Sequence, residues 1–494
     1  MKRVYRIHPE DNVAVALEAL RAGESADTGS GAVVLRSDVP AGHKVALRDI
    51  PQGETVVKYG FPIGTASCGI AAGDWVHTHN TATRLGGLLN YTYKPDFKPL
   101  PQQKPAVFSG YRRKDGKVGI RNEVWIIPTV GCVNAVAKQI EEESQKLLPR
   151  GVDGVYAFSH PYGCSQLSQD LLNTQLALCG LIRHPNAGGV LVLGLGCENN
   201  NVDEMKKVLG SYDPDRVKFL VCQEQEDEIA AGVEAVRELC AAASGFRREP
   251  CGADELVVGL KCGGSDGFSG ITANPLVGAF SDRLIAQGGT AVLTEVPEMF
   301  GAETLLMNRC KNEAVFRQTV DLINHFKQYF MDHHQKIDSN PSPGNKAGGI
   351  TTLEDKSLGC VQKGGSAPVC GVLSYGEPVV EKGLNLLQGP GNDLVASTAL
   401  AVSGAHLVLF TTGRGTPFGC PVPTVKISSN SALAHRKSGW IDFDAGRLLS
   451  GENIAGLSDE FFRYVLDVAS GLKTAQSERF NEHDLAIFKN GVTL

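Results

Sequence analysis

From Tyr111 onward the chain repeats one pattern, in which a short apolar run is followed by a glycine-containing turn and an amphipathic segment of helical length. Examples are EVWIIPTV before AVAKQIEEESQKLL, GGVLVLGLG before VDEMKKVLG, and ELVVGLKCGG before ANPLVGAFSDRLIAQ. Near-continuous apolar strands alternating with helices are typical of a parallel sheet with helices on both faces. We therefore predict an α/β fold for most of the chain.

A chain of 494 residues is too long for one hydrophobic core, so we expect several domains. Hydrophobic residues make up 42% and charged residues 21%, as in ordinary globular proteins. The formal net charge of −6 gives no field that would attract nucleic acid or an anionic membrane. These values favour chemistry on a small molecule, without a nucleic-acid or membrane partner.

The first part of the chain differs from the rest. Alternating segments such as HKVALRDI and ETVVKYGFPIG, separated by short turns, predict a small β-rich module over residues 1–92. The Pro-, Lys- and Gln-rich stretch that follows predicts an extended linker at 93–107. The run RREPCGAD is a candidate seam, which gives a middle α/β domain at 108–248 and a C-terminal α/β domain at 249–494.

Residues 338–365 form a long glycine-rich stretch with little helical or strand period. A loop of this length inside a compact enzyme is functional or disordered. Its acids and lysines favour a lid or active-site loop over a disordered insert.

The thirteen cysteines are an odd number in a chain without a secretory signal, so we expect reduced thiols and a cytoplasmic location. No run of about 20 apolar residues is present that would cross a bilayer. Burial, metal ligation and catalysis remain as uses for the thiols.

Ligands of open α/β sheets bind beyond the carboxyl ends of the strands, where helix N-termini offer free N–H groups. Four of the expected strand-to-helix turns carry a cysteine there: Cys132, Cys164, Cys197 and Cys262. Each cysteine either fills a tight turn or serves a site to which several turns contribute. The wide spacing matches no short zinc or ferredoxin motif, so ligation is allowed without being required.

Other residues at these turns and in the β-rich module are candidates for binding. His77 and His79 in VHTHN would point the same way on an extended strand, an arrangement suited to two metal ligands or to a polar strand edge. Arg121 and Arg414 flank strands, and guanidinium groups bind carboxylates in two-pronged fashion, although Arg121 is equally suited to a structural role. Neither a dinucleotide G-x-G-x-x-G motif after a first strand nor a P-loop is present.

Taken together, several long motifs resemble those of the altronate and galactarate dehydratase family of sugar-acid dehydratases. They include KYGFPIG, VHTHN, YRRKDGKVGIRNE, PTVGCVN, HPYGCSQL, LGLGCENN, LKCGGSDGFSGITANP, TEVPEMFGAE, PSPGNKAGGITTLEDKSLG and TTGRGTPFG, in order along nearly the whole chain. The resemblance implies an N-terminal SAF-like β-clip domain, a linker, a middle dimerisation region and an unusual Rossmann-like C-terminal domain. It also implies a homodimer that requires ferrous iron, or manganese, and converts D-altronate to 2-dehydro-3-deoxy-D-gluconate and water.

Such a dehydration removes a weakly acidic α-proton and then a poor leaving group, so it needs a base, an acid and stabilisation of an enediolate-like charge. We expect Lys261 or Lys356 to be the base, with a pKa lowered by burial or by a neighbouring cation. Glu295 or Glu354 would be the acid or would orient it. The expected metal ligands are His77, His79, Glu198 and Asp266, and the expected substrate contacts are Arg121, Asn134, Gln166, Asn199, Ser265 and Arg414.

Three alternatives remain open from the sequence. An iron–sulfur cluster on Cys132, Cys164, Cys197 or Cys262 would also serve as a Lewis acid. The chain would otherwise be a sugar-acid-binding protein without turnover. The third alternative is another lyase of the same family, acting on galactarate or on sulfolactate.

Overall fold

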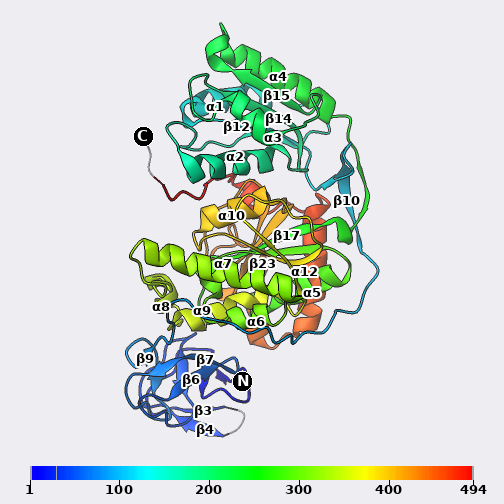
Figure 1. The fold of residues 1–494 in the computed structure, drawn as a ribbon. Helices are drawn as coiled ribbons and strands as arrows, with labels where there is room; N and C mark the ends of the chain where they lie inside the picture. Colours follow the sequence, from blue (N-terminus) through cyan, green and yellow to red (C-terminus); the bar gives the residue numbers. More distant parts are fainter. Residues whose placement is uncertain (1–2, 29–30, 492–494) are drawn as a thin grey trace.

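The computed structural model describes residues 3–28 and 31–491, which form three regions (Figure 1). In the view of Figure 1 the N-terminal β-domain lies at the bottom, the C-terminal α/β domain in the centre and the middle α/β domain at the top. The multidomain α/β fold predicted from the sequence is confirmed. In the described residues no helix combines the length and the apolar character needed to span a bilayer.

The N-terminal domain consists of short strands joined by tight turns. One antiparallel sheet has the order β1-β2-β5-β8 and a second the order β6-β7-β9, while β3 pairs with β4. The strands are β1 (Val4–Tyr5), β2 (Val13–Ala16), β3 (Ser25–Asp27), β4 (Ala32–Val34), β5 (Lys44–Ala46), β6 (Thr55–Lys58), β7 (Phe61–Ala66), β8 (Trp75–Val76) and β9 (Thr81–Ala82).

Residues 83–106 contain no helix or strand, so this irregular segment begins ten residues before the expected linker. It is bound along the C-terminal domain: the Tyr91 hydroxyl donates to Glu303 at 2.5 Å, the Tyr93 hydroxyl to the carbonyl of Cys310 at 2.5 Å. The aromatic residues among its prolines and lysines therefore fix it as a strap across the surface of another domain.

The middle domain has a four-stranded parallel sheet in the order β13-β12-β14-β15. Helices α1 and α4 pack on one face, and α2 and α3 on the other. Alternate residues of the central strand serve these two cores, since Ile126 packs with the α1 side and Ile127 with the α2 side. The elements are β12 (Glu123–Pro128), η1 (Gly131–Val133), α1 (Asn134–Gln145), β13 (Gly154–Ala157), α2 (Ser168–Ile182), β14 (Ala187–Gly194), α3 (Val202–Leu209), β15 (Val217–Val221), η2 (Cys222–Glu224) and α4 (Glu228–Ala243).

The chain enters and leaves the middle domain through paired strands. Strand β10 (Val107–Arg112) is antiparallel to both β11 (Val118–Gly119) and β16 (Arg248–Gly252). The run expected to be a seam is thus β16 itself, and it closes the middle domain against its own entry strand.

The C-terminal domain has a seven-stranded parallel sheet in the order β19-β20-β18-β17-β21-β22-β23. Helices α5 and α12 pack together on one face, and α10 joins the other face to α2 of the middle domain. Its elements are η3 (Ala253–Glu255), β17 (Val257–Cys262), α5 (Ala273–Ala286), β18 (Thr290–Leu293), η4 (Val296–Met299), α6 (Glu303–Met307), α7 (Glu313–Asp332), α8 (Pro343–Ala347), α9 (Leu353–Cys360), η5 (Val361–Gly364), β19 (Val369–Leu373), β20 (Gly383–Leu387), α10 (Asp393–Val402), β21 (Leu407–Thr412), β22 (Thr424–Ser428), α11 (Ser431–Arg436), β23 (Phe443–Asp444), η6 (Ala445–Ser450), α12 (Ile454–Ala469) and α13 (Gln476–Arg479).

Residues 338–365 are more ordered than their composition predicts. They contain α8, α9 and η5, and side-chain caps begin both α-helices: Ser342 accepts from the amide of Asn345, and Thr352 from the amide of Asp355. The weak helical period of this stretch did not predict these helices, because its polar residues act as helix caps.

Candidate active site

A cavity of about 820 Å³ lies at the carboxyl ends of β17, β18 and β20. Its polar wall includes Cys262 from the end of β17, Glu298 from η4, Lys356 from α9 and Asp393 from the first turn of α10. Aromatic residues of α7 (Glu313–Asp332) also line the cavity. This is the position at which open parallel sheets bind ligands, and the volume is ample for a six-carbon acid.

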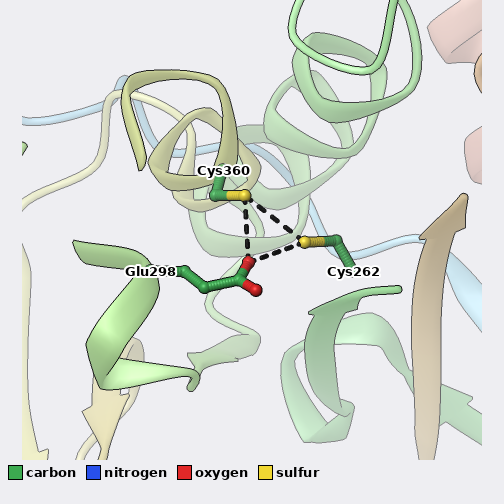
Figure 2. Close-up of side chains that lie close together, drawn as sticks. All are labelled: Cys262, Glu298 and Cys360. Atoms are coloured by element: carbon green, nitrogen blue, oxygen red, sulfur yellow. Dashed lines mark hydrogen bonds between the residues drawn. The ribbon is translucent and has the colours of Figure 1, made fainter. Parts of the chain in front are cut away.

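Cys262 and Glu298 of this wall meet a second thiol, that of Cys360 (Figure 2). The sulfur of Cys262 lies 3.3 Å from the sulfur of Cys360, and Oε2 of Glu298 lies 2.9 Å from the first sulfur and 3.1 Å from the second. Among the residues that the structure describes, this is the one group of three His, Cys, Asp or Glu side chains whose ligand atoms all lie within 4.8 Å of one another.

The electrostatic environment of this cluster keeps it partly ionised. Nζ of Lys356 lies 2.7 Å from Oε1 of Glu298. Burial opposes ionisation of Glu298, but the attraction of Lys356 and two further lysines outweighs it and holds the pKa of Glu298 well below its usual range. The hydrogen bond from Cys360 lowers the pKa of Cys262 to about 6, and the same bond together with burial raises the pKa of Cys360. The hydrogen bond between the two sulfur atoms therefore favours ionisation of Cys262 over that of Cys360.

A second group of charged side chains, Lys261, Glu295 and Asp393, lies next to the thiol–carboxylate group. Nζ of the fully buried Lys261 forms ion pairs with Glu295 and, at 2.9 Å, with Oδ1 of Asp393. Glu295 has a left-handed backbone with φ of 68°, and its Oε2 accepts from the amide of Cys262 at 2.9 Å. Burial and the nearby Cys262 and Glu298 raise the pKa of Glu295. Lys261 thus fixes a cavity carboxylate, Asp393, to the backbone of the cysteine strand.

The expected lowering of the lysine pKa values is wrong for both Lys261 and Lys356. Burial does oppose the charge on each ammonium group, but the paired carboxylates outweigh burial and raise both pKa values. Near neutral pH both side chains are cations, suited to binding or donating to an anion rather than to accepting a proton.

The donor set of the cluster fits a ferrous ion. Thiolate ligands suit iron and zinc, and a carboxylate adds a harder oxygen ligand. An ion held by these three residues would keep positions open for oxygen atoms of a substrate. Cys262 was expected as an alternative thiol ligand. In the structure the other possible ligands beside it are Glu298 and Cys360.

The two neighbours of Cys262 in the predicted site have different environments. Asp266 accepts hydrogen bonds from Ser269, Ser429 and Asn430, so both of its oxygens hold the loop together. Oγ of Ser265 is buried without a protein hydrogen-bond partner. Arg414 is exposed. A Cβ atom added to Gly264 would lie 3.2 Å from the Cβ of Arg414, so the backbones of the two residues are close.

The expected metal set of His77, His79, Glu198 and Asp266 does not assemble. The two histidines lie in a turn after β8 rather than along a strand, so His77 is buried against Thr351 while His79 is exposed. Burial and the nearby Lys44 lower the pKa of His77 to about 4. Glu198 lies in the middle domain and accepts from Thr129 and the amide of Gly196, both at 2.6 Å. The four residues thus occupy three different domains.

Two more candidates lie at contacts between segments. Glu354 accepts from the hydroxyl of Thr83 and the amide of Arg84, which fastens the end of the N-terminal domain to α9. Arg121 forms a buried ion pair with Glu478, 2.7 Å between Nε and Oε1, and donates to the carbonyl of Val468. The structural role considered for Arg121 accounts for all of these contacts.

The remaining candidates belong to turns of the middle domain, away from the cavity wall. Asn134 bonds to the backbone of His160, Gln166 accepts from the amide of Gly163, and Asn199 accepts from that of Ser165. The cysteines of these turns, Cys132, Cys164 and Cys197, are exposed, whereas Cys262 is buried. The four thiols proposed as alternative ligands therefore do not form one group.

Glu298, Cys360 and Asp393 were given no role from the sequence. Glu298 and Asp393 line the cavity, and Cys360 contacts Glu298 and Cys262. The motif TEVPEMFGAE already contained Glu298, and Pro297 is the second residue of the short η4 helix that carries this carboxylate. Cys360 lies at the end of α9, one helical turn after Lys356, so a helical reading of LEDKSLGC would have placed the two on one face.

Three family models together match almost all of the chain. D-galactarate dehydratase/altronate hydrolase, second domain, matches residues 110–244, and D-galactarate/altronate dehydratase, C-terminal, matches 253–493. The altronate/galactarate dehydratase SAF domain matches 2–84. The confirmed SAF domain ends close to Ala82, the last residue of β9.

Curated relatives resemble the chain over its whole length. It is 56% identical to altronate dehydratase of Escherichia coli K12, covering 99% of each chain, and 53% identical to altronate dehydratase of Bacillus subtilis 168, covering 100% of each. It is 35% identical to galactarate dehydratase (L-threo-forming) of Escherichia coli K12, covering 98% of this chain and 96% of that one.

Proposed function

The chain belongs to the D-galactarate/altronate dehydratase family, and we propose that it is a hydro-lyase that converts D-altronate to 2-dehydro-3-deoxy-D-gluconate and water. The observation that carries the choice of substrate is the full-length similarity to two proteins named altronate dehydratase, which exceeds the similarity to a galactarate dehydratase. The cavity beside Cys262, Glu298 and Lys356 supports the chemistry.

In this proposal Lys356 binds the substrate carboxylate. Of the described residues that line the cavity, it is the one lysine or arginine. Its ammonium group also contacts Asn340 and Asn345 at 3.0 and 3.1 Å, so it is held in place before substrate arrives. A fixed cation beside the carboxylate stabilises the negative charge that develops when the α-proton leaves.

Asp393 is the proposed acceptor of the proton at C2. Its side chain is 38% exposed, faces the cavity, and is oriented by the ion pair with Lys261. A carboxylate that is held by one buried cation and open to the cavity on its other side suits proton transfer. Glu295 completes the support, since it binds Lys261 and the amide of Cys262 at once.

Ferrous iron, or manganese, would be held by Cys262, Glu298 and Cys360. When bound there, the ion would supply Lewis acidity toward substrate oxygen atoms. Before any ion binds, Lys356 and Lys363 offset the negative charge that this ligand set carries.

The test is anaerobic turnover by metal-stripped protein, with and without ferrous iron, with D-altronate and galactarate as separate substrates. Formation of a 2-keto acid from D-altronate, restored by iron, is the expected result. Activity on galactarate alone would transfer the assignment to the other lyase of the family, and no keto acid from either would refute the proposal. Light scattering and cell fractionation test the homodimer and the cytoplasmic location that complete it.

A further inference from the structure

The middle domain exposes three cysteines on three neighbouring strands. Cys132, Cys164 and Cys197 follow β12, β13 and β14, and the sheet order β13-β12-β14 places β12 between the other two. Adjacent strands lie about 4.8 Å apart, so three parallel strands bring their three turns to one edge of the sheet. The active-site cavity in the C-terminal domain uses none of these thiols.

The three turns are fastened to one another by their backbones. The amide of Gly131 donates to the carbonyl of Tyr162 at 2.9 Å, and the amide of Asn200 donates to the carbonyl of Gly163 at 3.1 Å. Gly163 has φ of 97°, and a Cβ added there would lie 2.0 Å from the carbonyl oxygen of Thr129. The turns that carry Cys132 and Cys164 thus touch, and substitution of this glycine would separate them.

The third turn is fixed by Glu198, which follows Cys197. Its carboxylate accepts from the hydroxyl of Thr129 and from the amides of Leu195 and Gly196. Both oxygens of Glu198 are therefore used to hold the turns together, which leaves the thiols as the exposed soft donors of this edge.

The same edge attracts negative charge. Helices α1, α2 and α3 begin at Asn134, Ser168 and Val202, each within a few residues after one of the cysteines. The N-terminal end of a helix carries partial positive charge and unpaired N–H groups. A group with thiolate ligands and a net negative charge is stabilised at such a place.

The spacing of the sulfur atoms distinguishes between a single ion and a larger group. A metal–sulfur bond is about 2.3 Å, so one ion bound by three thiolates needs sulfur atoms within about 4.6 Å of one another. In the described part of the chain only Cys262, Glu298 and Cys360 meet a limit of 4.8 Å. Cys132, Cys164 and Cys197 do not form such a group, so at least one of their sulfur–sulfur distances exceeds 4.8 Å, and one ion bound directly by all three is excluded.

We propose that Cys132, Cys164 and Cys197 hold an iron–sulfur cluster at the carboxyl edge of the middle sheet. Soft thiolates on rigid, glycine-bearing turns are the ligands that such clusters take. With three cysteines, one iron of a four-iron cluster has no thiolate and takes an oxygen ligand. This centre is separate from the buried Cys262 group and does not depend on which sugar acid the cavity binds.

The experiment is anaerobic reconstitution of the full chain with ferrous iron, sulfide and a thiol reductant, followed by desalting. Bound iron and acid-labile sulfide are measured, together with visible absorption and electron paramagnetic resonance after reduction. The wild type should retain labile sulfide, give a cluster signal and hold more iron than sulfide, because the Cys262 group binds a further iron without sulfide. Each of Cys132→Ala, Cys164→Ala and Cys197→Ala should lose most of both, whereas Cys68→Ala, which removes an exposed thiol of the N-terminal domain, should retain both.

Several results would overturn the inference: no labile sulfide in the wild type, full retention in all three variants, or loss in Cys262→Ala with retention in the three. Circular dichroism shows whether each variant is folded, and the corresponding serine variants, which keep the size of the side chain, provide a second series. Keto-acid formation is assayed in the same samples. A cluster without turnover would refute the proposed function and support this inference, while turnover by sulfide-free protein would do the reverse.

Discussion

Lys44 of the N-terminal domain and Asp355 of α9 form a fully buried ion pair, with 2.8 Å between Nζ and Oδ2. Lys58 reaches the other oxygen of Asp355 at 2.9 Å, and Lys44 also donates to the carbonyl of Gly349. Asp355 directly precedes Lys356, the cation of the cavity wall. The N-terminal domain therefore helps to position a residue of the active site without lining the cavity itself.

Asp355→Asn is expected to loosen the N-terminal domain. It leaves two buried lysines without a full counter-charge, and breaking a buried pair in this way costs about 3–5 kcal/mol. The lysines hold the pKa of Asp355 well below its usual range despite burial, so its stabilisation is complete above the unfolded pKa and is lost as pH falls toward the folded one. Urea unfolding measures the loss, and unchanged stability would refute this role. Asp38→Asn, at an exposed pair with Arg21, is the control and should change little.

Lys356→Met should lower kcat/KM for D-altronate by about 100-fold or more, because a fixed cation stabilises the developing charge. Lys356→Arg should recover part of the activity, since it restores the charge with a different shape. Steady-state kinetics on both variants measure the effect. Lys346→Met, ten residues earlier in the same segment, should behave like wild type, and an equal loss there would mean that the segment is merely sensitive to substitution.

Glu298→Gln and Cys360→Ala should weaken binding of ferrous iron at the cavity, because each removes one ligand of the thiol–carboxylate group. Iron titration of the stripped protein measures affinity independently of turnover. Cys310→Ala is the matched control: this thiol is also buried, but it bonds to the carbonyl of Leu306 outside the cavity. Equal affinity in Cys360→Ala and Cys310→Ala would exclude the thiol pair as a metal site.

His406 should make stability depend on pH. Burial lowers its pKa to about 4 from an ordinary value of 6.5, and its Nδ1 accepts from the amide of Val257 at 2.9 Å. The folded state thus binds fewer protons than the unfolded state between these values, and stability falls as pH falls from 6.5 to 4, by up to about 3 kcal/mol from this group. Urea unfolding at pH 7 and pH 5 should show a smaller difference in His406→Gln, and an undiminished one would assign the effect to other buried histidines.

The sequence predicted the fold well because its apolar runs are long and its turns contain glycine. Lys261, Cys262 and Lys356 were placed in the site for a similar reason, since strand ends and a polar segment are visible along the chain. Their pairing was not predictable. Which carboxylate faces Cys262 depends on the chain after β18, where Glu295 has a left-handed backbone and η4 carries Glu298. These carboxylates raise the pKa values of the lysines instead of leaving them lowered.

For His77 and His79 the sequence predicted the wrong local structure. Their spacing of two is compatible with a strand, but β8 ends at Val76, and the side chain of Asn80 accepts from the amide of His77 to close a turn. Three further candidates, Asn134, Gln166 and Asn199, are amides that hold turns together, as do many polar residues beside glycine. Some polar residues at strand ends bind ligands and others only stabilise the turn. The hydrogen-bond partners of each residue show which role it has.

The buried pair of Lys44 and Asp355 joins residues 311 positions apart in sequence. At ribosomal rates of about 5–20 residues per second, roughly 15 to 60 s separate the synthesis of the two. During this interval the docking face of the nascent N-terminal domain meets water and chaperones rather than its partner helix. The ammonium groups of Lys44 and Lys58 are hydrated during this time, and they lose that water only when Asp355 of α9 takes its place against them.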